Sequence, residues 1–341
     1  MDWASPSTPK SAVFCGRPRR RTLAWLGALV AGMAAPSLRA AAYPERAVRI
    51  VVPFAAGAGT DAMGRLIAQQ LSAQMQAPFV VENRTGASGA VGAQAVARSL
   101  ADGHTLLLAA APFTTVPAVL PTAGYDPLAD FDPVGMWATG PLVWAVGAQV
   151  PARTLGEFIE LARKRPGYYN YGSAGVGGVN HLALEMLKAR TRTFITHIPY
   201  RGISQAVSDT LGGQIHVLTG TVPALAPMIR DGRLRALAVT GPRRTPVLPE
   251  VPTMAEAGLP DFVVLNYFAL VAPRGTPSTI RERLNREMGQ AAQAAEVKAR
   301  LAADGLDPAV DTPQALAAFL AQDLAMWRDV VKRQNLSVEA L

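Results

Sequence analysis

The stretch VVPFAAGAGTDAMGRL, residues 51–66, combines three patterns that together predict a strand–turn–helix unit. A β-branched run ends at Pro53, a turn of small residues follows, and a helical pattern opens at about Thr60. Gly57, Gly59 and Ala62 also fit G-x-G-x-x-A, the pattern of a dinucleotide-binding turn. The first question is whether this turn holds a dinucleotide or another anion.

A dinucleotide fits the turn poorly. The residues from Pro53 to Ala56 separate the strand from Gly57, whereas a dinucleotide turn follows its strand at once. Asp61 would lie beside the pyrophosphate at the helix start. Glu82, in the next strand-like run, is read more simply as a hydrogen-bonding group at a strand end than as a ribose ligand. The stretch therefore predicts no nicotinamide cofactor.

A general anion site requires fewer specific residues than a dinucleotide site. A helix N-terminus leaves up to four backbone N–H groups without partners and carries the positive end of the helix dipole. Glycines let a ligand approach these groups, so a carboxylate binds there without any Arg or Lys. The alternative is that Thr60 or Asp61 only caps the helix. A cap does not need the small residues from Ala55 to Gly59, which favours the anion site.

A second turn of this kind lies in the middle of the chain. YGSAGVGGVNHLALEML, residues 171–187, reads as strand, small-residue turn and helix. Ser173 offers a hydroxyl, and Gly175, Gly177 and Gly178 open the backbone. One such turn in each of two lobes predicts that an anion is held from both sides. A third turn, in NRTGASGAVGAQA at 83–95, is either another site or only a connection.

The first 42 residues are typical of a secretory signal peptide. A run of arginines precedes TLAWLGALVAGMAA, an apolar stretch too short for a membrane span, and small residues follow before Tyr43. We expect export to a bacterial periplasm with cleavage after Ala40 or Ala42; an uncleaved anchor is the alternative. The arginine pairs leave the general secretory and twin-arginine routes both open. No second apolar run reaches membrane length, so we expect a soluble, monomeric mature chain.

Composition excludes several classes of protein. The chain has 341 residues, of which 50% are hydrophobic and 17% charged, which excludes a disordered protein. The formal charge of +8 falls to +3 without residues 1–42, because six basic groups and one acidic group lie there. This balance and the scattered aromatic residues argue against a nucleic-acid partner. The single cysteine, Cys15, lies in the signal, so the mature chain has no disulfide.

Strand-like and helix-like patterns alternate along the mature chain, which predicts an α/β fold with parallel strands. Two strand-like crossings stand out, near 141–148 and 234–241. We therefore expect two α/β lobes joined by a two-strand hinge, with a ligand cleft between them. The expected limits are 43–145 and 239–341 for lobe 1, whose terminal helices pack across the lobes, and 146–238 for lobe 2.

Catalytic and metal sites find little support. YGSAG around Ser173 lacks the first glycine of the G-x-S-x-G elbow of serine hydrolases. The four histidines, His104, His181, His197 and His216, show no spacing typical of a metal site. We expect no catalytic residue, no metal and no cofactor. An exported enzyme that uses Ser173 and His181 is the alternative.

Longer blocks of the chain carry a resemblance. The blocks are YPERAVRIVVPFAAGAGTDAMGRLIAQQL, VVENRTGASGAVGAQAVARSLADGHTLLL, NYGSAGVGGVNHLALEML and HIPYRGISQAVSDTLGGQIHV. In this order they resemble the substrate-binding proteins of tripartite tricarboxylate transporters, the Bug or TctC family. The resemblance covers residues 43 to about 336.

The resemblance implies a periplasmic binding fold of type II that captures a small carboxylate, mainly with backbone amides, and delivers it to integral-membrane permease subunits. It also carries over a set of ligand-binding residues from both lobes. One wall comprises Phe54, Gly57, Ala58, Gly59, Thr60, Asp61, Phe113 and Thr114, and the other Ser173, Ala174, Gly175, Asn180, His181 and Tyr200.

The chain departs from the family pattern where the distal part of the pocket is expected. The first turn has alanines at 55, 56 and 58 where Pro or Gly is common. Thr221 stands where a larger polar group is usual, and Tyr267, directly after Asn266, represents an aromatic position of the family. These three residues complete the expected site. The family thus implies the class of ligand and leaves the compound open, and it leaves sensing for a signalling receptor as an alternative to transport.

Overall fold

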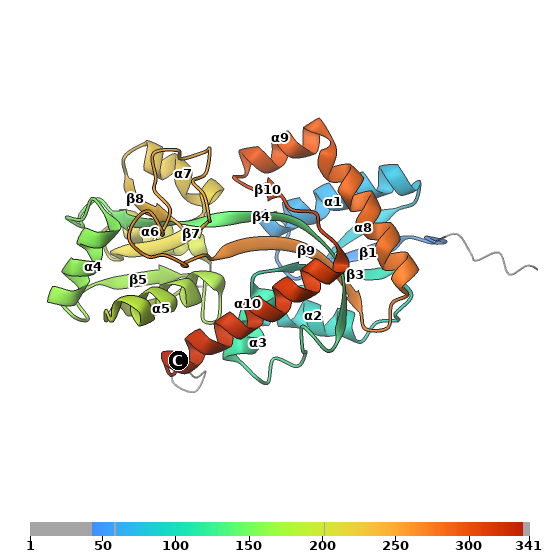
Figure 1. The fold of residues 1–341 in the computed structure, drawn as a ribbon, viewed down its shortest axis with the longest axis horizontal. Helices are drawn as coiled ribbons and strands as arrows, with labels where there is room; N and C mark the ends of the chain where they lie inside the picture. The colour runs from blue at the N-terminus through green and yellow to red at the C-terminus, as the bar shows by residue number, and fades with distance from the viewer. Residues whose placement is uncertain (1–42, 58, 201, 337–341) are drawn as a thin grey trace, which may run out of the picture. The chain divides into compact units, whose positions relative to one another are not determined.

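The structure is a computed structural model that describes residues 43–57, 59–200 and 202–336 (Figure 1). The expected signal peptide, its cleavage site and Ala58 lie outside the described residues. The described residues belong to one compact unit. In the described part of the chain, no helix is both long and apolar enough to cross a membrane.

Strands and helices alternate as the sequence predicts. The strands are β1 (Val48–Val52), β2 (Phe79–Asn83), β3 (Thr105–Ala110), β4 (Phe131–Gly147), β5 (Asn170–Ser173), β6 (Thr196–Pro199), β7 (Val217–Thr221), β8 (Leu234–Val239), β9 (Leu265–Pro273) and β10 (Asp307–Pro308). The helices are α1 (Gly59–Met75), η1 (Ala87–Gly89), α2 (Ala90–Ala97), α3 (Pro112–Val119), α4 (Leu155–Lys164), α5 (Val179–Thr191), α6 (Ile203–Leu211), α7 (Val222–Arg230), α8 (Ser278–Gln293), α9 (Ala295–Ala303) and α10 (Pro313–Arg333).

One long strand, β4, belongs to both halves of the sheet. The strand order is β2-β1-β3-β9-β4-β7-β5-β6, with β8 and β10 also paired to β4. β4 pairs with β9 as far as Pro141, opposite Leu265, and with β7 from Leu142 onward, opposite Thr221. The two halves are the two lobes of an α/β fold. β4 and β9 run between them in Figure 1.

The strand directions place the functional edges of the two lobes opposite each other. β1 is parallel to β2 and β3, and β3 is antiparallel to β9, which is antiparallel to β4. β1 and β3 therefore run towards lobe 2. β7 is antiparallel to β4, and β5 is parallel to both β6 and β7, so these three strands run towards lobe 1. The carboxyl ends of β1 and β3 consequently face those of β5, β6 and β7.

The chain returns to lobe 1 later than the sequence indicates. The run at 234–241 contains β8, which pairs with β4 inside lobe 2. Residues 241–264 follow, of which Pro252 and Met254 hydrogen-bond to Val239 at the end of β8, and the chain then enters β9 at Leu265. The buried Thr240 hydroxyl accepts from the Leu142 N–H at 2.8 Å and donates to the Val264 carbonyl at 2.5 Å. Thr240 thus ties together the two chain segments that cross between the lobes.

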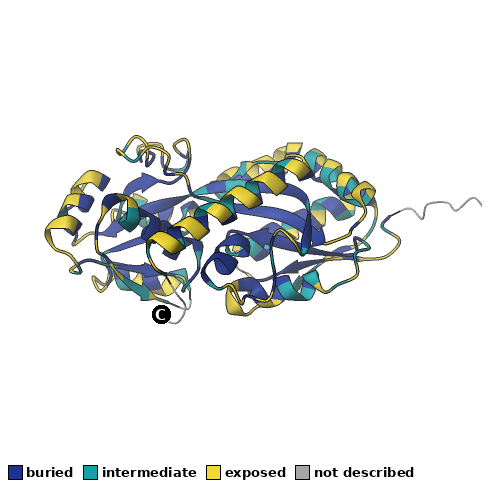
Figure 2. Cartoon of the chain, turned by 60° about the horizontal axis from the view of Figure 1, so that its bottom comes forward, coloured by how far each residue is buried: buried dark blue, intermediate teal, exposed yellow. Residues whose placement is uncertain are grey.

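The core is continuous from one lobe to the other. Its largest cluster includes Leu107 and Phe113 of lobe 1, Trp144 and Leu182 of lobe 2, and Trp327 of α10. Helix α10 packs against α3, β4 and α5, and it runs diagonally across both lobes in Figure 1. Figure 2 shows the strands buried and the outer faces of the helices exposed.

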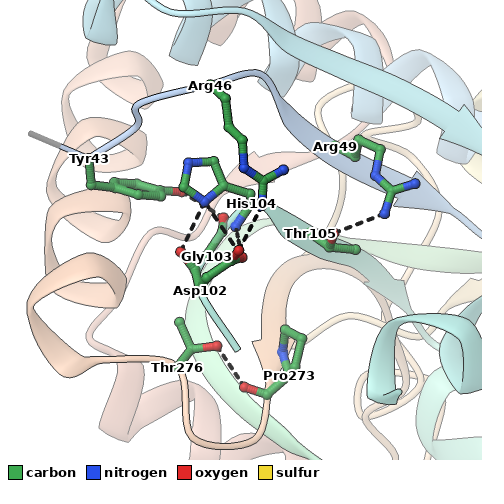
Figure 3. Close-up of polar contacts among 9 residues, drawn as sticks. All are labelled: Tyr43, Arg46, Arg49, Asp102, Gly103, His104, Thr105, Pro273 and Thr276. Carbon is green, nitrogen blue, oxygen red and sulfur yellow. Dashed lines mark hydrogen bonds and ion pairs between the residues drawn. The ribbon is translucent and has the colours of Figure 1, made fainter. Parts of the chain in front are cut away.

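The first described residues are anchored at the end of lobe 1 that lies away from lobe 2. The Tyr43 hydroxyl donates to the Gly103 carbonyl at 2.8 Å, and Arg46 pairs with Asp102 at 2.7 Å (Figure 3). The Tyr43 ring also meets His104 edge-on, with the ring centres 5.2 Å apart. Tyr43, the first described residue, is therefore part of the packed structure of lobe 1.

Candidate functional site

The turn after β1 is held in place by hydrogen bonds to the Asp61 carboxylate. Gly57 has a φ of +83°, and its N–H donates to the Asp61 carboxylate at 2.9 Å. Asn83, at the end of β2, donates to the same carboxylate at 2.9 Å and to the Phe54 carbonyl at 3.0 Å. Arg65 donates at 2.9 Å and holds the pKa of Asp61 at about 2, below its ordinary value. Asp61 is buried, so its contacts fit a residue that positions the turn rather than one that touches a ligand.

The turn itself presents backbone to open space. A Cβ added at Gly57 or at Gly59 would meet no atom within 4 Å. Helix α1 begins at Gly59, one residue before the expected start, and its first N–H groups have no acceptor within the helix. Thr60 lies in this first turn and is half-buried. The first turn thus offers donors without offering a cationic side chain.

The second turn follows β5 and is built around two histidines. The buried Ser173 hydroxyl lies 2.7 Å from His197 Nε2, and the Gly175 N–H donates to this hydroxyl at 3.2 Å. The Gly177 N–H donates to His181 Nδ1 at 3.2 Å. The turn from Ser173 to Gly177 is therefore fixed by imidazole nitrogens from α5 and β6.

The two imidazoles belong to a buried stack. The ring centres of His181 and His197 are 4.2 Å apart, and His197 is 4.6 Å from Tyr171. Burial lowers the pKa of His181 to about 4 and that of His197 to about 3, so both rings are neutral near pH 7. Glu185 accepts from Tyr171 at 2.5 Å and from Lys188 at 2.6 Å, so the buried Glu185 carboxylate is both hydrogen-bonded and paired with a cation.

The serine–histidine contact lacks the third member of a catalytic triad. Ser173 contacts His197, not His181 as the enzyme alternative supposed. His197 Nδ1 is buried and has no hydrogen-bond partner among the described residues. A general base needs a group that orients it, and here no described carboxylate occupies that place. The geometry fits a positioned hydroxyl better than an activated nucleophile.

Other expected residues of the second wall are engaged with neighbouring elements. The Tyr200 hydroxyl donates to Asp209 of α6 at 2.6 Å, and burial with this hydrogen bond raises the Tyr200 pKa to about 12. The Asn180 amide donates to the Thr219 carbonyl of β7 at 2.6 Å. Thr221 caps α7 with its backbone only, and Ala174 is exposed in the second turn. These residues line the carboxyl ends of β5, β6 and β7.

Three expected residues of lobe 1 point into the protein. Phe113 is buried and packs edge-on against Phe131, with the ring centres 5.0 Å apart. The Thr114 hydroxyl donates to Asp323 of α10 at 2.5 Å and lies 3.1 Å from the Tyr267 hydroxyl. Burial raises the pKa of Asp323 to about 6. Thr114 and Tyr267 thus contact α10. Asn266 of β9 is half-buried and lies opposite Gly140 of β4.

The two turns lie at the facing edges of the lobes. A Cβ added at Gly177 would lie 3.8 Å from Val119 and 4.0 Å from Val116, both on α3 of lobe 1. Helices α1, α3, α5 and α7 each begin directly after a strand that ends at this edge. Their positive dipole ends therefore converge on the space between the lobes, which suits an anion.

The cavities of the described structure do not mark this site. A cavity of about 820 Å³ lies between α4, β8 and residues 250–258 and contains none of the expected residues. A cavity of about 10 Å³, enough for one water, is lined by Phe54 and Phe113. We assign the site from strand direction and turn geometry, because a cleft between lobes is open until a ligand fills it. Among the described residues, no cluster of His, Asp or Glu could hold a metal.

Three residues that contact candidate site residues are not predicted from the sequence: His197, Asn83 and Asp323. His197 was noted only as one of four histidines. A signal for Asn83 existed, since it follows a strand that pairs with β1 and so ends beside the first turn. Asp323 lies 209 residues from Thr114, and nothing in the local pattern connects them.

Known proteins match almost the whole folded chain. Residues 63–336 match the sequence model of the tripartite tricarboxylate transporter family receptor. Protein BugT of Bordetella pertussis is 39% identical over 323 residues, which cover 94% of this chain and 99% of BugT.

Solved structures agree. A Rhodopseudomonas palustris protein with adipate has 35% identity and a TM-score of 0.78 over 86% of this chain and 99% of its own. MatC from Rhodopseudomonas palustris with bound malate has 32% identity and a TM-score of 0.74 over 85% of this chain and 100% of its own. The periplasmic binding protein BugD is 32% identical, with a TM-score of 0.75, over 86% of this chain and 99% of BugD. The expected fold and family are therefore confirmed.

Proposed function

Because the chain belongs to the tripartite tricarboxylate transporter receptor family, we propose that it is a periplasmic solute-binding protein that captures a small organic carboxylate between its lobes. The observation that carries the proposal is the opposition of two backbone turns, one after β1 and one after β5, across the facing strand ends. Each turn opens a helix N-terminus towards the cleft.

Two opposed turns suit a ligand with a carboxylate at each end. Adipate and malate, held by the two R. palustris relatives, are both dicarboxylates. We propose that one carboxylate contacts the first turn from Gly57 to Thr60 and the other the second turn near Ser173 and Gly175. No lysine or arginine belongs to the proposed set, so the donors are backbone N–H groups and hydroxyls. Such hydrogen bonds to a charged acceptor contribute about 1.5–3 kcal/mol each.

The proposed role ends with delivery to the integral-membrane subunits of a tripartite tricarboxylate-type transporter, without chemical change of the ligand. Export of the mature chain after cleavage near Ala42 agrees with the packing of Tyr43, the first described residue, in lobe 1. The lobe limits 43–145, 146–238 and 239–341 remain part of the proposal. A change of lobe along β4 is supported by the change of its partner from β9, which ends opposite Pro141, to β7, which begins opposite Leu142.

A thermal-shift series tests the carboxylate site. The mature chain, unfolded and refolded without additives, is screened with dicarboxylic acids of increasing length and with their diamides. Acids should raise the melting temperature and diamides should not. A shift by diamides or sugars alone would refute the anion site, and a need for zinc or NAD would refute the absence of a cofactor.

Two substitutions test the assignment of the turns. Ser173→Ala removes the buried hydroxyl that contacts His197 in the second turn, and Thr60→Ala removes a half-buried hydroxyl from the first. Each substitution should lower the affinity for the identified acid by roughly 2- to 13-fold, which corresponds to the loss of one net hydrogen bond of about 0.5–1.5 kcal/mol. Contraction in small-angle scattering on adding the acid would report closure of the lobes. Unchanged affinity in both variants would refute the clamp as assigned.

A further inference from the structure

Two exposed aromatic side chains lie together at the end of lobe 2. Phe194 is 61% exposed and Tyr168 is 50% exposed, and they are the only aromatic residues among the exposed large hydrophobic side chains of the described chain. Gly167 connects them, since it precedes Tyr168 and its N–H donates to the Phe194 carbonyl at 2.9 Å. A Cβ added at Gly167 would lie 3.2 Å from the Phe194 ring. Soluble surfaces rarely gather such groups without use.

Basic side chains frame these two rings. The Arg165 guanidinium carbon lies 3.4 Å from the centre of the Tyr168 ring, and Lys164 is exposed at the end of α4. Arg192, also exposed, follows α5 with a φ of +53°, a conformation that a glycine would adopt with less strain. Lys164, Arg165, Tyr168, Arg192 and Phe194 are called the tip patch below.

The positive charge of the tip patch is not neutralised from its own helices. The nearest acidic groups along α4 and α5, Glu160 and Glu185, are paired with Arg163 at 2.7 Å and with Lys188 at 2.6 Å. In the described part of the chain, no ion pair engages Lys164, Arg165 or Arg192. The tip patch is therefore a small apolar centre with a cationic rim.

The tip patch lies far from the cleft. It surrounds the starts of β5 and β6, and both strands run away from it towards lobe 1. A partner bound there leaves the facing turns free. None of the residues of the tip patch lines the three cavities between other elements.

We propose that the tip patch binds the surface of a membrane that contains anionic phospholipid. Aromatic rings beside cationic groups suit the boundary between headgroups and acyl chains, where the ring meets apolar material and the cation meets phosphate. Anionic lipid attracts basic side chains by charge complementarity. A flat lipid surface also fits rings that project from a turn. The inference goes beyond carboxylate capture and does not depend on which compound the cleft holds.

Vesicle flotation of the mature chain tests the tip patch directly. Binding is measured with vesicles of phosphatidylethanolamine and phosphatidylglycerol, and with vesicles of phosphatidylcholine alone, at low and at high salt. The wild type should bind the anionic vesicles, and high salt should weaken that binding. Each basic residue near an anionic surface contributes about fivefold, so the double variant Lys164→Glu, Arg165→Glu should bind at least about 25-fold more weakly. Phe194→Ser should weaken binding by about tenfold.

A matched variant in lobe 1 separates a local site from general charge and stickiness. Arg98→Glu with Leu100→Ser removes a basic group and a side chain that is 76% exposed. It should bind vesicles like the wild type. All variants should keep the wild-type affinity for the identified carboxylate, so failure of the tip patch and failure of the cleft are distinguishable.

Three results would overturn the proposal. They are absence of binding to anionic vesicles at low salt, equal binding to phosphatidylcholine, and undiminished binding of the Lys164→Glu, Arg165→Glu variant. If the chain ignores vesicles but binds an acidic membrane protein through the same residues, the tip patch is a protein-docking surface and the lipid proposal is wrong.

Discussion

Replacement of Asp61 by Asn should loosen the first turn at neutral pH and leave it unchanged in strong acid. Asp61 accepts from Gly57, Arg65 and Asn83 at 2.9 Å each. The Arg65 hydrogen bond lowers the pKa of Asp61 from 3.8 to about 2, and each unit corresponds to about 1.4 kcal/mol. Because the Arg65 side chain is 57% exposed, solvent screening reduces the stabilisation to about 1–2 kcal/mol.

The pH dependence of this effect has a definite sign. A carboxylate whose pKa is lower in the folded protein stabilises the fold above its unfolded pKa, and this stabilisation is lost as the pH falls through about 2. The free energy of unfolding of the wild type should therefore exceed that of Asp61→Asn by about 1–2 kcal/mol at pH 7, which is roughly 2–3 °C in melting temperature. The difference should shrink below about pH 4 and vanish near pH 2.

Urea unfolding from pH 7 down to pH 2.5 measures the difference. Glu256→Gln is the matched control, because Glu256 pairs with Arg244 at 2.8 Å but both side chains are almost half exposed. A solvent-exposed pair of this kind contributes little to stability. Equal stability of Asp61→Asn and the wild type throughout, or an equal loss in Glu256→Gln, would refute the role given to Asp61.

Three further substitutions have clear expected outcomes. Thr240→Val removes the acceptor of the buried Leu142 N–H and should cost about 1–3 kcal/mol in urea unfolding; a loss below about 0.5 kcal/mol would contradict its role at the crossing. Burial raises the pKa of Asp323 to about 6, so its contribution to stability is full below about pH 4 and is lost as the pH rises through 6. Asp323→Asn should remove this loss, so its free energy of unfolding at pH 7 should be about 2–3 kcal/mol higher than that of the wild type. Parallel pH profiles of the two proteins would exclude an ionising carboxyl. His197→Phe keeps a ring in the stack but removes the hydrogen-bond partner of the Ser173 hydroxyl. Calorimetry should show a roughly 2- to 13-fold lower affinity for the carboxylate, with little change in the free energy of unfolding. Wild-type affinity would show that this hydroxyl needs no positioning.

Local pattern was enough to predict most βα units and both glycine turns. It missed β9 and the first half of β4. FDPVGMWATG, residues 131–140, contains one proline and two glycines, which argue against a strand. The structure accommodates them because β4 shifts register against β9 between Pro133 and Gly135 and again between Met136 and Ala138. Only pairing with a distant strand makes this sequence extended.

The composition of the turns could be read from the chain, but the partners of their side chains could not. Asp61 fits the pattern of a helix cap, yet its carboxylate also binds Asn83, which is 22 residues away. Thr114 fits a cleft residue from its place after a strand, yet its hydroxyl contacts α10. Position along the chain predicts the edge of the sheet on which a residue lies. The direction of its side chain depends on the elements that pack there.

The continuous core beneath α10 has a consequence for how the molecule reports binding. One apolar cluster joins Phe113 of lobe 1, Trp144 of lobe 2 and Trp327 of α10. Unfolding of either lobe would therefore expose the apolar core of the other to water, so we expect the two lobes to unfold together. We expect a single calorimetric transition whose van't Hoff and measured enthalpies agree. A compound that touches only the cleft then raises the melting temperature of the entire chain, so occupancy of a few backbone donors becomes a property of about three hundred residues at once.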